Sequence, residues 1–404
     1  FAKYRVSQQG QDMQLIISQA MLMYAVNLIF KAADKRNSLA ILANLKLVLS
    51  PERLTLLASD LEVELQAEVA LPAGACQQAG QITVPANKFK EIIKLLPENA
   101  QVSIGVTDNK QCQIVFADSQ FRLNTLPAED FPLIGAPEAA TSVALSRETL
   151  LDLLDKTHFA MAIQDARYYL TGMLVELKDG LLTAVATDGH RLALARAATM
   201  QTSAETLSAI LPRKAVLELQ RLLSEMRRSS PNIDNAITLN IGREFVQVML
   251  PFGQSEKAAD NTQTPVVVTF TARLIDGKFP DYRRVIPTNT DKVARFDQEA
   301  LANILRRVSV LSNEKLRGVV FEFGDSERVR IRTSNAEHDE ASAVLPIRYQ
   351  GAPMEISFNV AYLLDVLNVL QGDIDMHMQQ ANGSVLIRQV NDSQHDYVIM
   401  PMRI

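Results

Sequence analysis

The sequence predicts an α+β protein made of three similar domains, each built from two units of one helix followed by strands. Three stretches carry this pattern, and they begin at Ser18, Ser146 and Asp297. In each stretch a residue suited to cap a helix precedes apolar residues at helical spacing, and two extended runs follow. Because one plan occurs three times at long intervals, the sequence indicates three related domains.

The clearest copy of the pattern covers residues 146–192. Apolar residues of the stretch 150–154 fall on one face of the predicted helix. Two extended runs follow at residues 172–177 and 181–186, and Asp179-Gly180 between them is typical of a tight hairpin turn. This copy therefore predicts a helix that leads into an antiparallel pair of strands.

The other two copies have the same helical spacing. The first begins at Ser18 and places these residues on one face: Leu22, Ala25, Val26 and Ile29. The third begins at Asp297 and places these on one face: Leu301, Ile304, Leu305 and Val308. Extended runs at residues 319–323 and 329–333 follow the third helix.

A second helix is predicted in each domain, beginning near Pro85, Pro212 and Asn359. Six half-units result. A helix with one apolar face needs a sheet to cover, so half-units laid side by side place helices on one surface and sheet on the other. Exposed sheet edges at both ends are a hazard unless paired, and a symmetric dimer that joins edge to edge closes twelve units into a ring.

The domain boundaries follow from the repeat, and we place the domains at residues 13–134, 140–277 and 288–404. Residues 1–12 lie outside the repeat and are interpreted as a tag remnant or a flexible extension. The second domain contains an insertion at residues 251–265, whose polar composition predicts an exposed loop. The link at 276–287 is too aromatic and basic to be only a spacer.

Composition is that of an ordinary globular protein, with 404 residues, 47% of them hydrophobic and 22% charged. No apolar run reaches the roughly 18 residues that a membrane span requires, so we expect a cytoplasmic protein with no membrane partner. Cys76 and Cys112 form neither a Cys-x-x-Cys pair nor part of a metal-ligand cluster, which predicts reduced, ordinary thiols.

Few residues suggest catalysis. His190 beside Asp188 allows general acid–base chemistry, but the chain has no Gly-x-Ser-x-Gly nucleophile motif, and a structural role is favoured. Asp373, Asp375 and His377 share one strand face, where a solvated surface is favoured over a metal site. Phosphate-binding and dinucleotide-binding glycine motifs do not occur. The sequence therefore predicts a protein without catalytic residues, metal or cofactor.

Basic residues recur on the polar faces of the predicted helices, although the net charge of the chain is -5. The residues concerned are Lys31, Lys35, Arg36, Lys88, Lys90, Lys94, Arg213, Lys214, Arg221, Arg227, Arg228, Arg306 and Arg307. Two interpretations remain open. These faces are either ordinary solvated surfaces, or they form one basic surface suited to duplex phosphates without base readout.

Five segments resemble the bacterial sliding clamp family, the beta subunits of DNA polymerase III. They are residues 164–170, 186–192, 279–285, 311–315 and 397–404. The resemblance covers the chain from about Met13 to its end. It implies three DNA-clamp domains per chain, with helices lining the inside and sheets the outside of a homodimeric ring that encircles duplex DNA.

The resemblance also implies a non-catalytic subunit that makes the polymerase processive. Its implied partners, which dock through short linear motifs, are the DNA polymerase III alpha subunit, the clamp-loader delta subunit, other polymerases and mismatch-repair proteins. The alternative from another class is a protein-interaction scaffold with the same repeat fold that does not bind DNA.

Site residues follow from the same resemblance. The implied peptide-binding pocket consists of Leu170, Thr187, Gly189, His190, Arg191, Leu192, Pro280, Arg284, Val285, Asn359, Tyr362, Ser384, Val398, Met400, Pro401, Met402 and Arg403. The implied DNA-facing residues are Arg36, Gln164, Tyr168, Arg213 and Lys214. The implied dimer interface consists of Lys88, Phe121, Leu123, Val310, Leu311, Glu337 and Glu340, with Asp339 adding charge opposite Lys88.

The C-terminal tail is too apolar for an unanchored terminus. Val398, Met400 and Met402 suit an adaptable binding pocket, because methionine side chains are flexible and polarisable. The alternation around Tyr397 and Ile399 also allows the tail to be the last core strand of the third domain.

Overall fold

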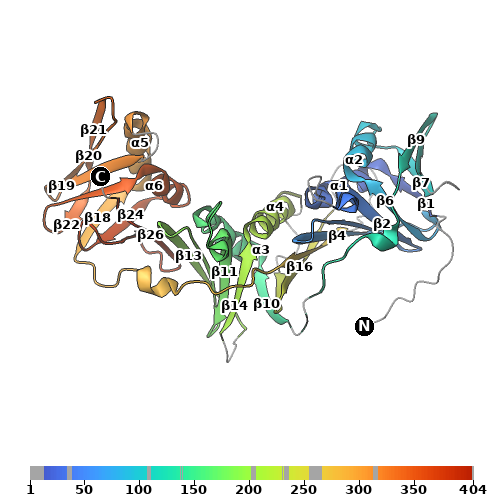
Figure 1. The fold of residues 1–404 in the computed structure, drawn as a ribbon, viewed down its shortest axis with the longest axis horizontal. Helices are drawn as coiled ribbons and strands as arrows, with labels where there is room; N and C mark the ends of the chain where they lie inside the picture. Colours follow the sequence, from blue (N-terminus) through green and yellow to red (C-terminus); the bar gives the residue numbers. More distant parts are fainter. Residues whose placement is uncertain are drawn as a thin grey trace. The chain divides into compact units, whose positions relative to one another are not determined.

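The computed structural model describes residues 13–33, 39–106, 111–136, 138, 140–201, 206–229, 231, 236–253, 266–312 and 317–402. The chain forms two compact units (Figure 1). One contains Phe1–Arg147 and Leu217–Leu274, and the other contains Glu148–Val216 and Ile275–Ile404. The extension predicted at residues 1–12 and most of the insertion at 251–265 lie outside the described residues.

Helices α1 (Gln19–Ile29) and α2 (Ala86–Leu95) pack against each other in the first unit. The side chain of Ser18 accepts a hydrogen bond of 3.4 Å from the backbone N–H of Met21, so the predicted cap is confirmed. All four residues predicted on the apolar face of α1 are buried. This face contacts strands of both sheets of the unit.

The first unit contains two antiparallel sheets. The five-stranded sheet has the order β5 (Cys76–Gln78), β1 (Gln14–Ser18), β7 (Gln101–Val106), β8 (Gln111–Phe116) and β9 (Ser119–Asn124). The eight-stranded sheet has the order β10 (Thr141–Ser146), β15 (Ala236–Ile241), β16 (Phe245–Phe252), β17 (Val266–Arg273), β4 (Val63–Ala70), β3 (Arg53–Ser59), β2 (Asn44–Ser50) and β6 (Gly80–Pro85). Strands β17 and β4 pair over their length, so this sheet joins segments that we assign to the first and second domains.

The second unit also contains two antiparallel sheets. The nine-stranded sheet has the order β14 (Leu207–Pro212), β11 (Gly172–Lys178), β12 (Leu181–Thr187), β13 (Arg191–Ala198), β26 (His395–Ile399), β25 (Val385–Gln389), β24 (Asp373–Met378), β18 (Lys292–Asp297) and β22 (Arg348–Gln350). The four-stranded sheet has the order β21 (Glu340–Pro346), β20 (Arg328–Ser334), β19 (Gly318–Phe323) and β23 (Met354–Asn359). Here β13 pairs with β26, the last strand of the chain.

The hairpin between β11 and β12 confirms the prediction from Asp179-Gly180. Lys178 lies opposite Leu181, so the turn has two residues. Asp179 and Gly180 have φ angles of 50° and 76°. Two successive positive φ values give a turn whose twist matches that of the strands, and aspartate and glycine tolerate them best.

Four further helices follow in chain order: α3 (Arg147–Asp155), α4 (Arg213–Ser229), α5 (Gln298–Val308) and α6 (Val360–Leu367). Asp297 and Asn359 cap α5 and α6, because their side chains accept from the N–H groups of Ala300 and Ala361. Short 3₁₀ turns are η1 (Phe30–Ala32), η2 (Ala40–Ala43), η3 (Ala128–Asp130), η4 (His158–Ala160), η5 (Tyr168–Thr171), η6 (Tyr282–Val285) and η7 (Ser309–Leu311).

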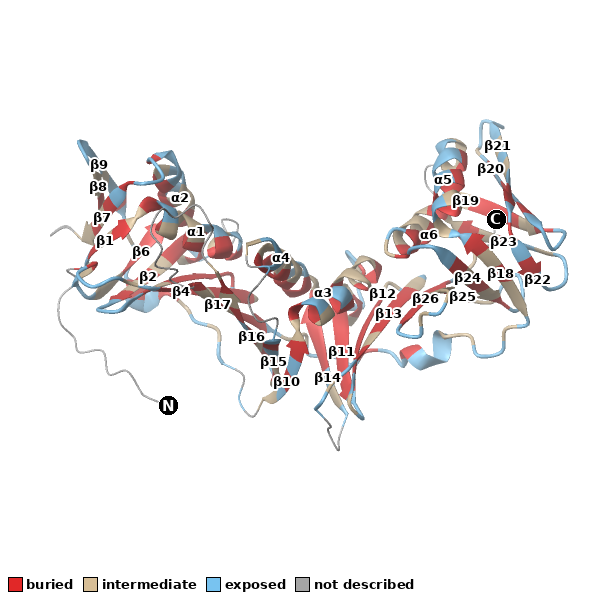
Figure 2. Ribbon diagram, turned by 180° about the vertical axis from the view of Figure 1, so that it is seen from behind, coloured by how far each residue is buried: buried red, intermediate tan, exposed pale blue. Residues whose placement is uncertain are grey.

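Burial follows the surfaces on which helices and strands meet (Figure 2). In the second unit, α5 contacts β18 of one sheet and β20 and β21 of the other. Phe321 packs edge-on against Phe358 at a ring separation of 5.5 Å and against Phe296 at 6.4 Å. The core of the unit therefore lies where the helices and the two sheets meet.

The mixed α+β fold and the repeated unit of one helix followed by strands are confirmed within the described residues. The three domain boundaries stay a prediction, because the two compact units do not follow them. None of the helices in the described ranges is long and apolar enough to cross a membrane.

Candidate functional site

An apolar cluster in the second unit brings together segments that are far apart in the sequence. Three predicted pocket residues belong to it: Leu170 of η5, Leu192 of β13 and Val398 of β26. The other buried members are Ala162, Leu174, Val185, Leu194, Ile210, Phe279, Tyr282 and Leu386. The basic, aromatic link at 276–287 packs into this core through Phe279 and Tyr282, so it is more than a spacer.

The C-terminal tail is held by backbone hydrogen bonds to other segments of the second unit. Val398 lies opposite Leu192 in the pairing of β13 with β26. Beyond the strand, the N–H of Met400 donates to the carbonyl of His190 at 2.9 Å, and the N–H of Met402 donates to the carbonyl of Ser357 at 2.8 Å. The backbone from Val398 to Met402 is therefore fixed along the edge of the cluster.

The core-strand interpretation holds for the first part of the tail, and the pocket interpretation stays a prediction for the rest. Tyr397 and Ile399 are fully buried, so the tail is a core strand as far as Ile399. Met400 follows directly and is 40% exposed. The predicted pocket residues of the tail thus lie where a core strand leaves the sheet, and Arg403 lies outside the described residues.

The loop from β12 to β13 has a fixed shape. The hydroxyl of Thr187 donates to the carbonyl of Arg191 at 2.6 Å and accepts from the N–H of Gly189 at 3.1 Å. One carboxylate oxygen of Asp188 accepts from the N–H groups of His190 and Arg191, at 2.9 and 3.0 Å. Gly189 has a φ of 89°, a conformation that side-chain-bearing residues rarely adopt. This geometry confirms a structural role for Asp188.

His190 and Tyr362 form one side of the site. Their rings are stacked at a separation of 6.2 Å with an interplanar angle of 17°. Tyr362 lies on α6, which Asn359 caps through its side-chain oxygen. The exposed His190 therefore presents a ring whose orientation is set by a helix of the third predicted domain.

Arg191 is enclosed by protein groups. Its guanidinium donates to Asp188, to Asp365 of α6 and to the carbonyl of Phe159. The guanidinium carbon lies 4.6 Å from the centre of the Tyr362 ring and 5.5 Å from that of Phe159. Arg191 therefore positions the wall of the site.

Further predicted pocket residues come from the link before the third domain. Val285 in η6 is 38% exposed, and its carbonyl accepts from the hydroxyl of Ser384 at 3.3 Å. Arg284 is exposed and pairs with Asp281 at 3.1 Å. Pro280 is exposed between the buried Phe279 and Tyr282. We call the predicted pocket residues and the segments that carry them the groove, after the pocket that the resemblance implies: the cluster residues Leu170, Leu192 and Val398, the loop 187–191, the residues Pro280, Arg284, Val285 and Ser384, residues Asn359 and Tyr362, and the tail 400–402.

Three contributors were not identified from the sequence as site residues: Phe159, Arg167 and Asp365. Arg167 donates to the carbonyl of Asp188 at 3.2 Å, and a Cβ atom on Gly189 would lie 3.1 Å from its guanidinium nitrogens. The hydrogen bond from Arg167 lowers the pKa of Asp165 to about 2. Arg167 lies within one of the five segments that carry the resemblance, whereas nothing in the sequence singled out Phe159 or Asp365.

The predicted DNA-facing residues of the second unit are accessible. Gln164 is exposed, and Tyr168 is 57% exposed. Arg213 is half-buried and donates to the carbonyl of Met161 at 3.4 Å, while Lys214 is exposed at the start of α4. Arg36 lies outside the described residues.

Basic side chains of the first unit gather on its helices. Lys90 of α2 lies 4.1 Å from the centre of the Phe30 ring. Burial lowers the pKa of Lys90, and repulsion from Lys94, Lys31 and Arg221 lowers it further. These four residues therefore share a region of positive potential, although Arg221 also pairs with Glu218.

The predicted interface residues lie on two edge strands, on α2, in η7 and in the turn before β21. Phe121 and Leu123 lie on β9, the last strand of the five-stranded sheet, where Phe121 is half-buried and Leu123 is buried. In the second unit Val310 is 77% exposed, and Leu311 is half-buried. Lys88, Glu337 and Glu340 are exposed, and Glu340 begins the edge strand β21.

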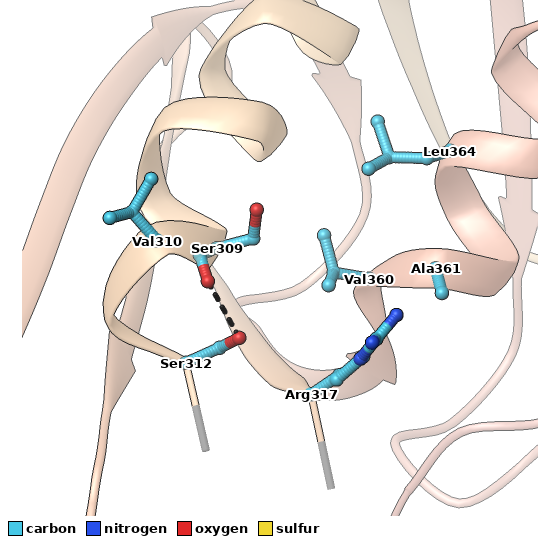
Figure 3. Close-up of a pocket in the computed structure, with 7 residues that line it drawn as sticks. All are labelled: Ser309, Val310, Ser312, Arg317, Val360, Ala361 and Leu364. Atoms are coloured by element: carbon cyan, nitrogen blue, oxygen red, sulfur yellow. Dashed lines mark hydrogen bonds between the residues drawn. The ribbon is translucent and has the colours of Figure 1, made fainter. Parts of the chain in front are cut away.

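A hollow of about 480 Å³ lies beside Val310 (Figure 3). Its lining consists of Ser309, Val310, Ser312, Arg317, Val360, Ala361 and Leu364. The side chains come from η7 and the following Ser312, from Arg317 directly before β19, and from the first turns of α6. The hollow thus combines apolar walls with one arginine at its rim.

The Asp373, Asp375 and His377 face of β24 carries an ion pair. Asp375 accepts two hydrogen bonds of 2.7 Å from Arg295 on the neighbouring strand β18. Within the described ranges, no group of three or more His, Cys, Asp or Glu side chains is placed to hold a metal ion.

Comparison with known proteins identifies the family. Models of the DNA polymerase III beta subunit match the chain in three consecutive parts, the N-terminal domain at residues 13–135, the central domain at 144–281 and the C-terminal domain at 283–403. The chain belongs to the DNA polymerase III beta subunit family. The Beta sliding clamps of Pseudomonas aeruginosa and Vibrio cholerae are 36% and 39% identical to it, over 97% of this chain and 100% of each relative.

Solved structures of the family have the same fold. The sliding clamp of Pseudomonas aeruginosa bound to griselimycin matches with a TM-score of 0.86 at 36% identity, over 97% of this chain and 100% of that chain. The clamp of Caulobacter crescentus matches with a TM-score of 0.84 at 32% identity, over 97% and 100%. The prediction of three clamp domains is therefore confirmed, and the function of the chain is that of a sliding clamp.

Proposed function

We propose that the groove is the docking site for short linear motifs of replication and repair proteins. One observation carries the proposal: Leu170, Leu192 and Val398 belong to one buried cluster, and exposed apolar residues follow cluster members along the chain. Val285 follows the cluster residue Tyr282 in η6, and Met400 follows Val398. An apolar floor with exposed apolar rims suits the anchor side chains of an extended peptide.

Polar groups around the apolar floor orient the bound peptide. His190 and Arg284 are exposed, and both carry donors for peptide carbonyls or carboxylates. Methionines such as Met400 adapt their shape to different anchors, so one groove accepts several partners. A motif that fills such a groove binds at about 1 to 50 μM, or roughly -6 to -8 kcal/mol.

The partners that we infer are the DNA polymerase III alpha subunit, the clamp-loader delta subunit, other polymerases and mismatch-repair proteins. The relative from Pseudomonas aeruginosa is known in complex with griselimycin, which supports a ligand-binding surface in this family. We infer that the chain itself catalyses no reaction and acts in the cytoplasm as the processivity subunit.

Deletion of residues 400–404 tests the docking site. The truncated chain keeps β26 and its buried residues, so it should fold and dimerise. Binding of a labelled Gln-x-x-Leu-x-Phe peptide, measured by fluorescence anisotropy, should be lost. Unchanged peptide binding by a folded, truncated dimer would place the docking site elsewhere.

We infer that two chains assemble head to tail through β9 of one copy and β21 of the other. Both are edge strands, and an edge strand of one copy offers its open side to an edge strand of the other. Phe121 is available to fill the hollow beside Val310, and Lys88 is complementary in charge to Glu337, Asp339 and Glu340. A dimer built this way closes into a ring.

Duplex DNA is the inferred cargo of the ring. The positive region around Lys31, Lys90 and Lys94, together with Gln164 and Tyr168, supplies contacts to phosphates without base readout. Loose contacts of this kind allow sliding, so sequence preference is absent and the affinity of the unloaded protein is low and depends on salt.

Loading onto circular DNA tests the inferred encirclement. After loading onto a nicked circle, the protein should stay bound in salt that removes electrostatic contacts, because the link is topological. Cutting the circle should release it. Retention on the linear product in high salt would contradict encirclement and favour a scaffold that does not surround DNA.

A further inference from the structure

His395 lies between two carboxylates, outside the groove. Its Nδ1 atom is 2.7 Å from a carboxylate oxygen of Asp392, and its Nε2 atom is 3.0 Å from one of Asp152. Asp392 lies in the turn before β26, whereas Asp152 lies on α3. The imidazole therefore connects the last strand of the chain to a helix that precedes it by more than two hundred residues.

Both ring nitrogens face acceptors, and this fixes the charge of the ring. Ionised carboxylates only accept hydrogen bonds, and a neutral imidazole has only one N–H. Two such bonds at once therefore require the imidazolium form. His395 itself is 7% exposed, and the Asp392 side chain beside it is 20% exposed, whereas Asp152 is half-exposed.

The charges around the ring favour the same form. Asp152 faces it from α3, Asp392 from the preceding turn, and Tyr397 lies two residues further along β26. Asp396 points to the other side of β26, where it pairs with Arg196 of β13 and Arg388 of β25. Burial lowers the pKa of His395, but the hydrogen bonds and charges of Asp152 and Asp392 outweigh burial and raise it above the usual 6.5.

A continuous set of contacts leads from His395 to the groove. Strand β26 carries Val398 into the apolar floor, and its continuation places Met400 at the rim. Tyr397 stacks on Phe159 at a ring separation of 6.1 Å. Phe159 in turn accepts a hydrogen bond of 2.8 Å from Arg191 through its carbonyl.

We propose that His395, bridging Asp152 and Asp392, is a positioning residue for the groove, and that loss of its proton weakens peptide docking. The inference rests on the proposed function of the groove. His395 touches no peptide in this arrangement. It acts by fixing β26 against α3, and so by fixing Val398, Met400 and the Phe159–Arg191 contact.

The direction of the pH effect follows from the raised pKa. The imidazolium bridge is fully present below about pH 6.5, the unfolded value, and is lost as the pH rises through the higher pKa of the folded protein. Peptide affinity should therefore fall as the solution becomes alkaline. His190 lies in the groove and can contribute its own pH dependence. The contribution of His395 is therefore measured as the ratio of two peptide affinities, that of the wild type and that of a variant at His395.

The test compares the wild type with His395→Gln, in which the side chain remains polar but carries no charge. Affinity for a labelled Gln-x-x-Leu-x-Phe peptide is measured by fluorescence anisotropy from about pH 6 to 9.5, on either side of the usual histidine value. The matched control is His377→Gln on β24, which lies outside the set of contacts described above. Thermal melting at each pH confirms that every variant is folded.

At the acid end the wild type should bind about threefold to tenfold more tightly than His395→Gln, the size of effect expected from a residue remote from the ligand. The ratio of the wild-type peptide affinity to that of His395→Gln should approach one at the alkaline end. The affinity of His377→Gln should equal that of the wild type at every pH. A ratio that is constant with pH would overturn the inference and leave His395 as a structural residue. A wild type that binds no peptide at any pH would instead overturn the proposed function of the groove.

A second measurement covers the case in which His395→Gln does not fold. Asp152→Asn removes a half-exposed partner and leaves the bond to Asp392 in place. In the wild type, selective ¹³C labelling of histidine should show His395 titrating with a midpoint above about 6.5, and Asp152→Asn should lower this midpoint and the peptide affinity together. A lowered midpoint with unchanged affinity would overturn the inference.

Discussion

Arg191 and Tyr362 meet with the guanidinium carbon 4.6 Å from the centre of the aromatic ring. Arg191 opens β13, and Tyr362 lies in the first turn of α6, so this contact joins segments that we assign to the second and third domains. Hydrogen bonds from the same guanidinium to Asp188, Asp365 and the Phe159 carbonyl fix the orientation of the contact. One side chain thus holds the loop 187–191 against α6.

Replacing Arg191 with lysine should weaken both the fold and peptide binding. Lysine keeps the charge but lacks the planar fork that reaches three acceptors and stacks on a ring. We expect Arg191→Lys to lower the free energy of unfolding by about 1 to 3 kcal/mol, measured by urea denaturation, and to weaken peptide binding. The exposed Arg330→Lys is the matched control, and an equal effect of both substitutions would contradict the role of Arg191.

Local features of the fold could be predicted because they depend on neighbouring residues. Ser18 caps α1 and Asp179-Gly180 forms the turn of a hairpin, and both follow from preferences that act over a few residues. The pairing of β17 with β4, and of β13 with β26, could not be predicted in this way. These registers join distant segments, and local periodicity carries no information about which strand becomes the neighbour.

The groove was predicted through resemblance more than through physical reasoning from the residues. The resemblance supplied Leu170, Leu192 and Val398, which the structure places in one cluster. It did not supply Asp365 or Phe159, because their role is to hold Arg191 and they carry no motif of their own. Supporting residues of this kind become visible only when the backbone brings distant segments together.

Met400 should contribute to peptide binding without contributing much to stability. Its side chain is 40% exposed, so it has apolar surface left to bury against an anchor residue. We expect Met400→Ala to weaken peptide binding about tenfold, since burying a methionine side chain contributes roughly 1.5 to 3 kcal/mol. Calorimetric titration measures the affinity. Met249→Ala, in the first unit and 54% exposed, should leave it unchanged.

Val310 should matter for assembly. It is 77% exposed beside the hollow, so an aspartate at this position disturbs little within one chain but places a charge in the inferred interface. Val310→Asp should shift the protein from dimer to monomer in dilute solution, as measured by mass photometry. Met200→Asp, at a position that is 98% exposed, should remain dimeric. If the Val310→Asp variant remains dimeric, Val310 does not belong to the interface.

The two cysteines should differ in reactivity. Burial raises the pKa of the Cys112 thiol to about 12, whereas Cys76 is only partly buried and its pKa is raised less by the same cause. The thiolate is the reactive form, so a raised pKa and lack of access both slow modification. A thiol titration of the native protein should detect one group, and unfolding should expose the second. Two groups reacting together in the native state would contradict the burial of Cys112.

Charge reversal on the helices of the first unit should weaken DNA binding before loading. Lys31 and Lys94 are exposed and belong to the positive region that lowers the pKa of Lys90. Each phosphate contact contributes roughly one unit to the dependence of log affinity on log salt. The Lys31→Glu, Lys94→Glu double variant should therefore lower the affinity for a short duplex in low salt and reduce that slope by about two.

The matched control is a second double variant with the same net charge as the first. Its substitutions lie on the nine-stranded sheet of the second unit. Lys178 at the end of β11 and Arg348 on β22 are both exposed, and both lie on strands and not on helices. The Lys178→Glu, Arg348→Glu double variant should bind the duplex nearly as the wild type does, because the inferred phosphate contacts lie on the helices and not on the sheet. If both double variants lose affinity equally, net charge alone governs DNA binding. In that case the helices would carry no specific DNA-facing surface.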